Sequence, residues 1–483
     1  MAVAALVGFA LFGRSGPPPG VPVVPTVGAG SGAEPLADPF AYRRDAGEAM
    51  AERAAFGVSH PLYTNSPGGA VATAERTAVW RPLVERAARQ AEVDPDRLEG
   101  LVFLESAGRP DAITPNGLDG AVGLTQILAE TGQNLLGMRV DLGESRRLTR
   151  RMARAQRRGQ EGLAERLEDR RRRIDERFDP ALSLAASARY LTMARERFGR
   201  EDLAFVSYHM GQGNLEGVLR AFSGRDDGDI GDVVADEELD WPRVYFDSTP
   251  RRHRAAYRRL AGFGDDSSNY LWKVEAGSEI MRLWREDRAE LERIADLQTA
   301  KASAEEVLRP ASETTIFRTP DELQAAWDDG DIRALPDDPA ATGLNRHRGM
   351  GELARRLGEP AALYRGLRPE ALALALYVGA QVRDIAGGGT LTVTSTVRDQ
   401  AYQDLLITGN DQATRRYSLH TTGYSLDVAR LYDSRRQARA FQWVLDRLRV
   451  LGVIAWVREP HAIHMTVGED AEALLPLLDR LEE

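Results

Sequence analysis

The feature that most constrains the fold is a change of pattern part-way along the chain. In the first part apolar residues recur at helical spacing, as in 79–87. Beyond it, short strand-like runs appear at 391–395 and 451–457 and alternate with helical patterns. A chain of 483 residues is long enough for two to four domains. We predict a multidomain protein, with a mainly α domain at 76–295 and an α+β domain at 344–483.

The segments outside these two domains differ from them in composition. Residues 296–343 are rich in proline and acidic residues, which predicts an interdomain linker with a short helix at 321–327. Residues 16–75 begin as a Pro/Gly-rich stretch and are predicted to form a tether and lead-in. Residues 1–15 are apolar and too short to span a bilayer comfortably, which fits a signal-like or anchor-like segment without the usual preceding basic residue.

Composition excludes several classes of function. The chain has no Cys, so it forms no disulfide and no thiolate metal site. Its net charge of -10 argues against general binding of nucleic acid. The exception to this acidic balance is an Arg-rich insertion at 144–177, where Glu and Arg recur at helical spacing. It predicts a solvated helical hairpin, or alternatively a basic arm that contacts anionic wall polymers or lipid head groups.

A helix that begins at Asp94-Pro95 places one carboxylate, Glu105, at its end. An apolar run precedes Glu105, and burial there would raise the pKa of the carboxyl group enough to make it a general acid. The chain continues as Glu105-Ser106-Ala107-Gly108 and later as Gly120-Ala121-Val122-Gly123-Leu124-Thr125-Gln126-Ile127. Two further segments follow, Val206-Ser207-Tyr208-His209-Met210-Gly211-Gln212-Gly213-Asn214 and Asn269-Tyr270-Leu271-Trp272-Lys273-Val274.

These four segments, in this order, resemble the motifs of the lysozyme-like lytic transglycosylases, the SLT domain. The resemblance implies that Glu105 is the single acid and base, which cleaves a MurNAc-GlcNAc bond and closes a 1,6-anhydro ring without water. Ordinary glycosidases use two carboxylates. Asp111 and Asp119 are candidates for a second one, so a hydrolytic lysozyme is the alternative.

The same resemblance assigns substrate contacts. It implies that Ser106 orients the substrate, although a helix-end hydroxyl is an equal interpretation. The other residues implied to contact the glycan, or to sit in the cleft, are Gln126, Tyr208, His209, Asn214 and Tyr270. His209 stands where the family prefers Asn, and Tyr270 is expected to reach the Glu105 carboxyl.

Histidine and aspartate gather near the C-terminus. They occur in Ser418-Leu419-His420-Thr421-Thr422-Gly423-Tyr424-Ser425-Leu426-Asp427 and in Glu459-Pro460-His461-Ala462-Ile463-His464. Imidazole and carboxylate are the zinc ligands open to a protein without Cys. This pattern resembles the peptidase M15-like zinc peptidases, which include D-Ala-D-Ala carboxypeptidases.

The M15-like resemblance implies that Zn²⁺ is the cofactor and that His420, Asp427 and His464 are its ligands. It also implies that Arg398 holds substrate and that Ser418 belongs to the binding motif. The chain departs from the family where a Glu is expected three residues before the last ligand, because His461 stands there. His461 or the upstream Glu459 is therefore the candidate general base.

Together the two resemblances predict a bifunctional bacterial enzyme of the cell envelope. Its partner would be peptidoglycan, both glycan strands and stem peptides, with no nucleic acid and with a membrane tether through the N-terminal segment. Export to the periplasm, wall or exterior is expected. The alternative from another class is a wall-binding scaffold, whose C-terminal domain binds zinc or substrate without efficient peptidase activity.

Overall fold

The computed structural model describes residues 22–25, 27, 36–408 and 417–482. The chain forms two compact units. The helical domain comprises 44–314, and the sheet domain comprises 315–408, 417–445, 458–482 and the described residues before 44. Residues 446–457 group with the helical domain, although they continue a helix and form most of a strand that belong to the sheet domain. The apolar segment predicted at 1–15 lies outside the described residues. Within the described part, no helix has the length and apolar character needed to cross a membrane.

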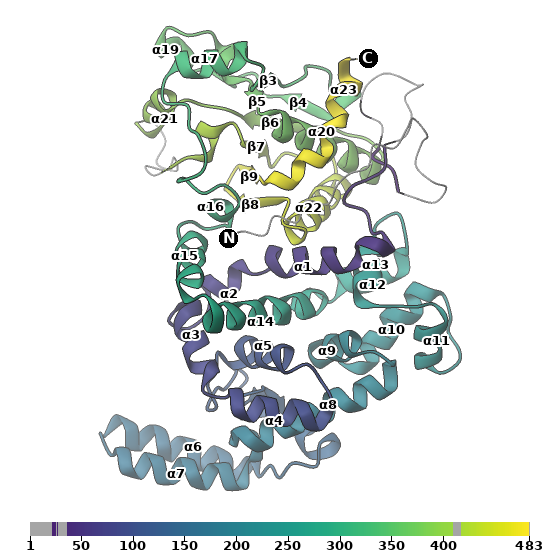
Figure 1. Cartoon of the computed structure of the whole chain (residues 1–483), viewed down its shortest axis with the longest axis vertical. Helices are drawn as coiled ribbons and strands as arrows, with labels where there is room; N and C mark the ends of the chain where they lie inside the picture. The colour runs from purple at the N-terminus through teal and green to yellow at the C-terminus, as the bar shows by residue number, and fades with distance from the viewer. Residues whose placement is uncertain (1–21, 26, 28–35, 409–416, 483) are drawn as a thin grey trace. The chain divides into compact units, whose positions relative to one another are not determined.

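The helical domain is built from α-helices and one two-stranded ribbon (Figure 1). Its elements are α1 (Gly47–Gly57), α2 (His60–Thr64), α3 (Gly69–Ala78), α4 (Arg81–Ala91), α5 (Pro95–Ser106), β1 (Ala121–Val122), β2 (Ile127–Leu128), α6 (Leu142–Arg157), α7 (Glu161–Ile174), α8 (Pro180–Phe198), α9 (Glu201–Met210), α10 (Gln212–Ser223), α11 (Ile230–Asp236), α12 (Trp241–Asp247), α13 (Arg254–Gly262), α14 (Tyr270–Glu286), α15 (Arg288–Thr299) and α16 (Glu305–Leu308).

Helix α5 has clear sequence signals at both ends. The Asp94 side chain accepts a hydrogen bond from the Asp96 amide at 2.8 Å, and Pro95 occupies the first turn. Ala107 ends the helix in the left-handed conformation at φ 54°. Halfway along, Gly100 faces α14, where a Cβ would overlap the Val274 carbonyl. The missing side chain therefore lets α5 and α14 cross in close contact.

The later part of the predicted tether and lead-in at 16–75 is folded and helical. Residues from 44 onward fold as η1 (Arg44–Ala46) and α1 to α3, which belong to the helical domain. Their buried faces consist mainly of small residues, including Ala54, Ala70 and Ala74. Alanine favours helices, and its small side chains allow close packing, so the composition indicates buried helices better than flexibility.

The Arg-rich insertion forms the predicted helical hairpin. Helices α6 and α7 pack against each other through Leu148, Met152 and Leu167. Figure 1 shows the pair as a long arm of the helical domain. The hairpin therefore has its own small core, and most of its arginines face solvent, although Arg171 is buried.

The sheet domain is α+β, with a five-stranded mixed sheet in the order β4-β6-β7-β9-β8. Its elements are α17 (Pro320–Asp328), β3 (Arg333–Ala334), α18 (Pro339–Thr342), β4 (Leu344–Arg346), α19 (Ala354–Leu357), β5 (Gly366–Leu367), α20 (Pro369–Ala386), β6 (Leu391–Ser395), α21 (Gln400–Ile407), η7 (Leu419–Thr422), β7 (Ser425–Ala429), α22 (Arg435–Val450), β8 (Ile454–Arg458), β9 (Ala462–Val467), η8 (Glu469–Leu474) and α23 (Pro476–Glu482). Strands β4 and β6 run parallel, whereas β6, β7 and β9 pair antiparallel.

The predicted linker at 296–343 is also wrong in extent. Its first part completes α15 and forms α16 in the helical domain, and the division between the units falls at 314/315. The rest is part of the sheet domain, where Phe317, Leu323 and Ile332 are buried in a core cluster. Strand β3 pairs with β5. Proline begins α17 and α18 at their first turns, so it marks helix starts here and not an extended connector.

The described residues of 36–43 belong to the sheet domain. Asp38 accepts hydrogen bonds from the Tyr377 hydroxyl and the Gln381 amide of α20, each at 3.1 Å. The Phe40 ring meets the edge of Tyr377 with centroids 5.5 Å apart. The chain therefore contributes to the sheet domain before it builds the helical domain.

Candidate functional sites

Glu105 lies at the last turn of α5, where α14 covers it. The Tyr270 hydroxyl donates a hydrogen bond to Glu105 Oε1 at 2.6 Å, so the predicted contact between the two residues is present. Burial raises the pKa of Glu105 to about 7, although the hydrogen bond from Tyr270 lowers it. Burial also raises the pKa of Tyr270 well above its usual value, so the phenol remains the donor. A carboxyl group with this pKa can give and take a proton near neutral pH.

An aromatic stack extends from Tyr270. The Tyr208 ring of α9 is nearly parallel to it at a centroid distance of 6.4 Å, and the His209 ring stacks on it at 5.1 Å. His209 is exposed, whereas the Tyr208 hydroxyl donates to the Thr125 carbonyl at 2.8 Å. Three of the predicted site residues are thus gathered around Glu105, and Tyr208 also holds the loop that contains Thr125.

The loop from Leu118 to Ile127 is fixed by a buried arginine that the sequence analysis did not single out. The Arg177 guanidinium, with none of its side chain exposed, donates to the carbonyls of Leu118, Gly120 and Ile127 at 3.2–3.4 Å. Asp175 binds the same guanidinium through two contacts of 2.9 Å. The only sequence signal for Arg177 was its place at the end of the Arg-rich insertion. There it could not be distinguished from the many exposed arginines.

The remaining predicted glycan contacts are engaged within the protein. The Gln126 amide donates to the Gly123 carbonyl at 2.8 Å, and the Asn214 amide donates to Met210 at 2.9 Å. Ser106 is buried, and its hydroxyl donates to the Val102 carbonyl of its own helix at 3.2 Å. This hydrogen bond is the one expected if Ser106 is an ordinary hydroxyl at the end of a helix and does not orient the substrate.

The two candidates for a second carboxylate stand apart from Glu105 electrostatically. Asp111 is exposed, and Asp119 is exposed and paired with Arg146 of α6. Burial alone raises the pKa of Glu105, the hydrogen bond from Tyr270 opposes that rise, and neither aspartate is among the causes of the shift.

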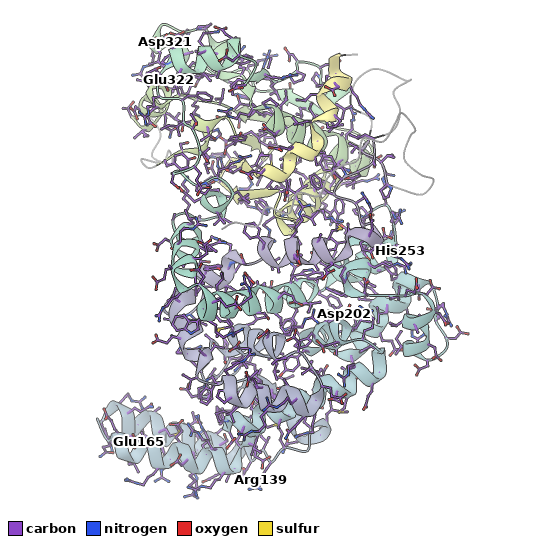
Figure 2. All side chains as sticks on the ribbon, viewed as in Figure 1. Arg139, Glu165, Asp202, His253, Asp321 and Glu322 are labelled. Atoms are coloured by element: carbon purple, nitrogen blue, oxygen red, sulfur yellow. The ribbon has the colours of Figure 1, made fainter. Side chains whose placement is uncertain are left out.

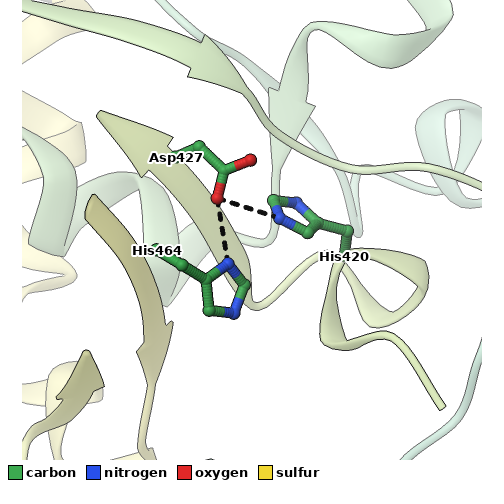
Figure 3. Close-up of side chains that lie close together, drawn as sticks. All are labelled: His420, Asp427 and His464. Atoms are coloured by element: carbon green, nitrogen blue, oxygen red, sulfur yellow. Dashed lines mark hydrogen bonds and ion pairs between the residues drawn. The ribbon is translucent and has the colours of Figure 1, made fainter. Parts of the chain in front are cut away.

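The second site lies in the sheet domain, where His420, Asp427 and His464 converge (Figure 3). Asp427 and His464 are paired across β7 and β9, and η7 brings His420 to the same carboxylate. Asp427 Oδ1 is 3.2 Å from His420 Nε2 and 2.9 Å from His464 Nδ1. The three potential ligand atoms all lie within 4.8 Å of one another. The structure thus gathers all three predicted ligands.

The donor chemistry of this cluster fits a divalent cation. His420 Nδ1 contacts the Thr396 carbonyl at 2.8 Å, and because a carbonyl only accepts, Nδ1 carries a proton. Burial and Arg398 lower the pKa of His420 to about 4, so Nε2 presents a lone pair to Asp427. Burial opposes ionisation of Asp427, but His420 and His464 hold its pKa well below the usual range. A lone pair facing a carboxylate oxygen is favourable only with a cation between them, and a backbone carbonyl is the usual orienting partner of a metal-binding His.

Arg398 lies beside this cluster. Its guanidinium donates to Ser395 Oγ at 2.6 Å, to Gln403 at 3.0 Å and to Asp427 Oδ2 at 3.4 Å. It also lines a cavity of about 150 Å³ together with Tyr364, Tyr402 and other residues of this domain. The guanidinium is therefore placed to bind an anionic group that enters this cavity.

The two candidate bases occupy different positions. His461 is exposed in the turn before β9. It lies three residues before His464, and residues an odd number apart along a strand point to opposite faces of the sheet. Glu459 is half-buried and contributes to the electrostatic environment of Arg398. Ser418 is buried, with its carbonyl accepting from the Thr421 amide at 2.9 Å. Exposure and the influence of Glu459 on Arg398 therefore favour Glu459 over His461 as the candidate base.

Comparison with known proteins supports the helical domain. Residues 155–229 match the Transglycosylase SLT domain. This SLT match contains Tyr208, His209 and Asn214, begins inside α6, and lies after Glu105. Over 230 residues the chain is 26% identical to "Endo-type membrane-bound lytic murein transglycosylase A" from two strains of Klebsiella pneumoniae. Each alignment covers 45% of this chain and 90% of the relative. The chain is thus similar to a lytic murein transglycosylase over part of its length.

Proposed function

We propose that the helical domain is a peptidoglycan lytic transglycosylase of the bacterial cell envelope, with Glu105 as its single acid and base. The observation that carries this proposal is the Glu105 carboxyl, which is half-buried and hydrogen-bonded to Tyr270, with a pKa that burial raises to about 7. The similarity to lytic murein transglycosylases supports the substrate class.

The proposed reaction uses the Glu105 carboxyl group twice, first as an acid and then as a base. Protonated Glu105 gives its proton to the glycosidic oxygen as the bond between that oxygen and C1 of MurNAc breaks. The resulting carboxylate takes the proton of the MurNAc 6-hydroxyl, and O6 bonds to C1 to form the 1,6-anhydro ring. The Tyr270 phenol stabilises the carboxylate between the two steps. No water is consumed, and Glu105 ends protonated.

The products test this reaction. Purified sacculi incubated with the protein should release muropeptides that end in 1,6-anhydroMurNAc, detected by mass spectrometry. Glu105→Gln should abolish their release, because an amide cannot exchange the proton. Reducing ends in place of anhydro ends would support the hydrolytic lysozyme alternative. No product from the wild type would favour a wall-binding scaffold.

We also propose that the sheet domain contains a zinc site that cleaves the stem peptide. His420, Asp427 and His464 would hold Zn²⁺, which supplies Lewis-acid activation when bound. Arg398 would bind the peptide carboxylate in the adjacent cavity, and Glu459 would accept a proton from the attacking water. The observation that supports this proposal is the converged ligand set.

Two measurements separate peptidase activity from binding alone. Zinc content of the purified protein should fall on His420→Ala, whereas stem-peptide cleavage should fall on both His420→Ala and Glu459→Gln. The matched variant His461→Gln should retain cleavage, because His461 is exposed outside the cluster. Zinc binding without cleavage of any stem peptide would support the scaffold alternative for this domain.

A further inference from the structure

The hairpin of α6 and α7 concentrates positive charge in an acidic protein. Residues 142–174 contain twelve arginines and five acidic residues, whereas the whole chain has a net charge of -10. Figure 2 shows the side chains of both helices pointing outward along the arm, with Glu165 labelled on it. This charge separation within one domain indicates an electrostatic contact surface.

The exposed arginines of α6, with Arg158 directly after its end, form one face of the helix. They are Arg147, Arg150, Arg151, Arg154, Arg157 and Arg158. Steps of three and four residues keep them on the same side, along about 17 Å at 1.5 Å per residue. Arg147 is paired with Glu144. We name these six residues the arginine face.

The hairpin lacks the apolar surface that a membrane-inserting helix needs. Its large apolar side chains, such as Leu148, Met152 and Leu167, are buried between α6 and α7. All of 142–174 is described, and none of its large hydrophobic side chains is exposed. An interfacial helix would instead present such residues to the lipid. The arginine face therefore fits a hydrated polyanion better than a bilayer.

The base of the hairpin is joined to the loop beside Glu105. Arg146 of α6 pairs with Asp119, and Asp175, which follows α7, holds Arg177 against three carbonyls of the same loop. The Ser145 hydroxyl of α6 adds a 2.8 Å hydrogen bond to Asp175. The base of the hairpin is thus tied to the loop whose Thr125 carbonyl accepts the hydrogen bond from Tyr208.

We propose that the arginine face binds the stem-peptide carboxylates of the glycan strand that occupies the Glu105 site. This inference rests on the proposed transglycosylase function and specifies its substrate as a strand that carries free carboxylates. The guanidinium fork binds carboxylates through paired hydrogen bonds, and several such contacts along one helix retain the polymer between cleavages.

The test measures binding of the full chain with Glu105→Gln, so that it does not depend on catalysis. The hairpin variant combines Arg150→Gln, Arg154→Gln, Arg157→Gln and Arg158→Gln. The control combines Arg86→Gln, Arg89→Gln, Arg254→Gln and Arg258→Gln, which changes the net charge equally at exposed positions of the same domain. Affinity for purified sacculi is measured at about 50 mM and about 500 mM salt, since screening weakens such contacts.

At low salt the hairpin variant should bind about tenfold to a hundredfold more weakly than the control, and high salt should remove the difference. Sacculi whose carboxylates have been converted to neutral amides should bind both variants equally. Equal binding of the two variants to untreated sacculi would overturn the proposal. So would a difference that persists on amidated sacculi, or one confined to anionic lipid vesicles.

Cleavage of short soluble glycan fragments separates this proposal from the proposed function. With Glu105 intact, the hairpin variant should cleave fragments without stem peptides at the wild-type rate and should digest sacculi more slowly. If wild type itself cleaves neither substrate, the proposed function fails while the binding result still stands. Equal loss of both activities in the hairpin variant would show a structural role and would overturn the proposal.

Discussion

At the scale of single residues, the Glu105–Tyr270 pair sets the protonation of the active carboxyl group. The phenol lowers the pKa of Glu105, so Tyr270→Phe should raise it above about 7. The limb of the pH–rate profile at which the protonated acid is lost should move to higher pH, and the rate should fall because the carboxylate loses its stabilising donor. Measurement of kcat/KM against pH checks both effects.

A buried tyrosine outside the site is the matched control for this prediction. Tyr245 donates its phenol hydrogen bond to Asn269 at 2.7 Å, so Tyr245→Phe removes a similar bond from the same domain. The pH–rate profile of Tyr245→Phe should lose activity at the same pH as that of wild type. A Tyr270→Phe profile with an unmoved limb would show that the hydrogen bond does not tune Glu105.

Because the pKa of Glu105 is raised in the folded state, the free energy of unfolding should decrease as pH rises. Burial favours the protonated form, so the stabilising contribution is present below the ordinary Glu pKa and is lost as pH rises through about 7. Glu105→Gln should therefore gain stability over wild type by up to about 3 kcal/mol between about pH 4.5 and pH 7.5.

Urea unfolding at a series of pH values measures this difference. The exposed Glu165→Gln on the hairpin is the control, and its stability relative to wild type should stay nearly constant over the same range. A Glu105→Gln difference that is flat with pH would mean that the carboxyl group titrates at its ordinary value.

Residue types and their order in the sequence were enough to name two groups of candidates that the structure brings together: Glu105 with Tyr270, and His420 with Asp427 and His464. They did not find Arg177 or the Thr396 carbonyl, because a buried guanidinium and a backbone acceptor carry no distinctive pattern. They also gave no reason to prefer Glu459 or His461 as the general base. Only the exposure of His461 and the electrostatic influence of Glu459 on Arg398 distinguish the two.

At the scale of elements, the crossing of α5 and α14 positions Tyr270 above Glu105. Gly100 permits this crossing, since a Cβ there would overlap α14. Gly100→Ala should force the helices apart and lower stability by about 1–3 kcal/mol. It should also reduce glycan cleavage, because the Tyr270 hydrogen bond depends on the helix spacing. Thermal unfolding and anhydromuropeptide release measure the two effects.

Gly262 in α13 is the matched control for the helix crossing. It has open space where a Cβ would lie, so Gly262→Ala should leave both stability and activity close to wild type. If Gly100→Ala unfolds at the wild-type temperature, then the close crossing is not needed to hold the site.

Elements with strong local signals were predicted well. The cap at Asp94, the hairpin at 144–177 and the strand at 391–395 all have patterns that neighbouring residues determine. The lead-in and linker were misjudged because proline and small residues occur both in loops and at helix starts. Whether such a segment packs into a domain depends on residues that are far away in the sequence, and a short window of sequence does not contain them.

At the scale of the whole molecule, the two sites belong to separate units, so metal removal should affect one of them. A chelator should lower the unfolding temperature of the sheet domain, since a bound cation stabilises the folded state by mass action. Glycan cleavage by the helical domain should persist. Calorimetry with and without Zn²⁺, together with product analysis, checks this expectation.

His420→Ala provides the control for metal removal. Its unfolding should be insensitive both to chelator and to added Zn²⁺, because the ligand set is incomplete. Equal stabilisation of wild type and His420→Ala by Zn²⁺ would place the metal elsewhere in the protein. Loss of glycan cleavage on chelation would show that the two units do not act independently.

The docking of residues 36–43 on α20 affects the order in which this protein can fold during synthesis. Asp38 and its partner Tyr377 are separated by 339 positions in the chain. The early segment leaves the ribosome long before α20 exists, so it must wait unpaired while the intervening helices are made. The sheet domain can close only late, and a chain that is truncated before α20 would expose Phe40 as a site for chaperones or proteases.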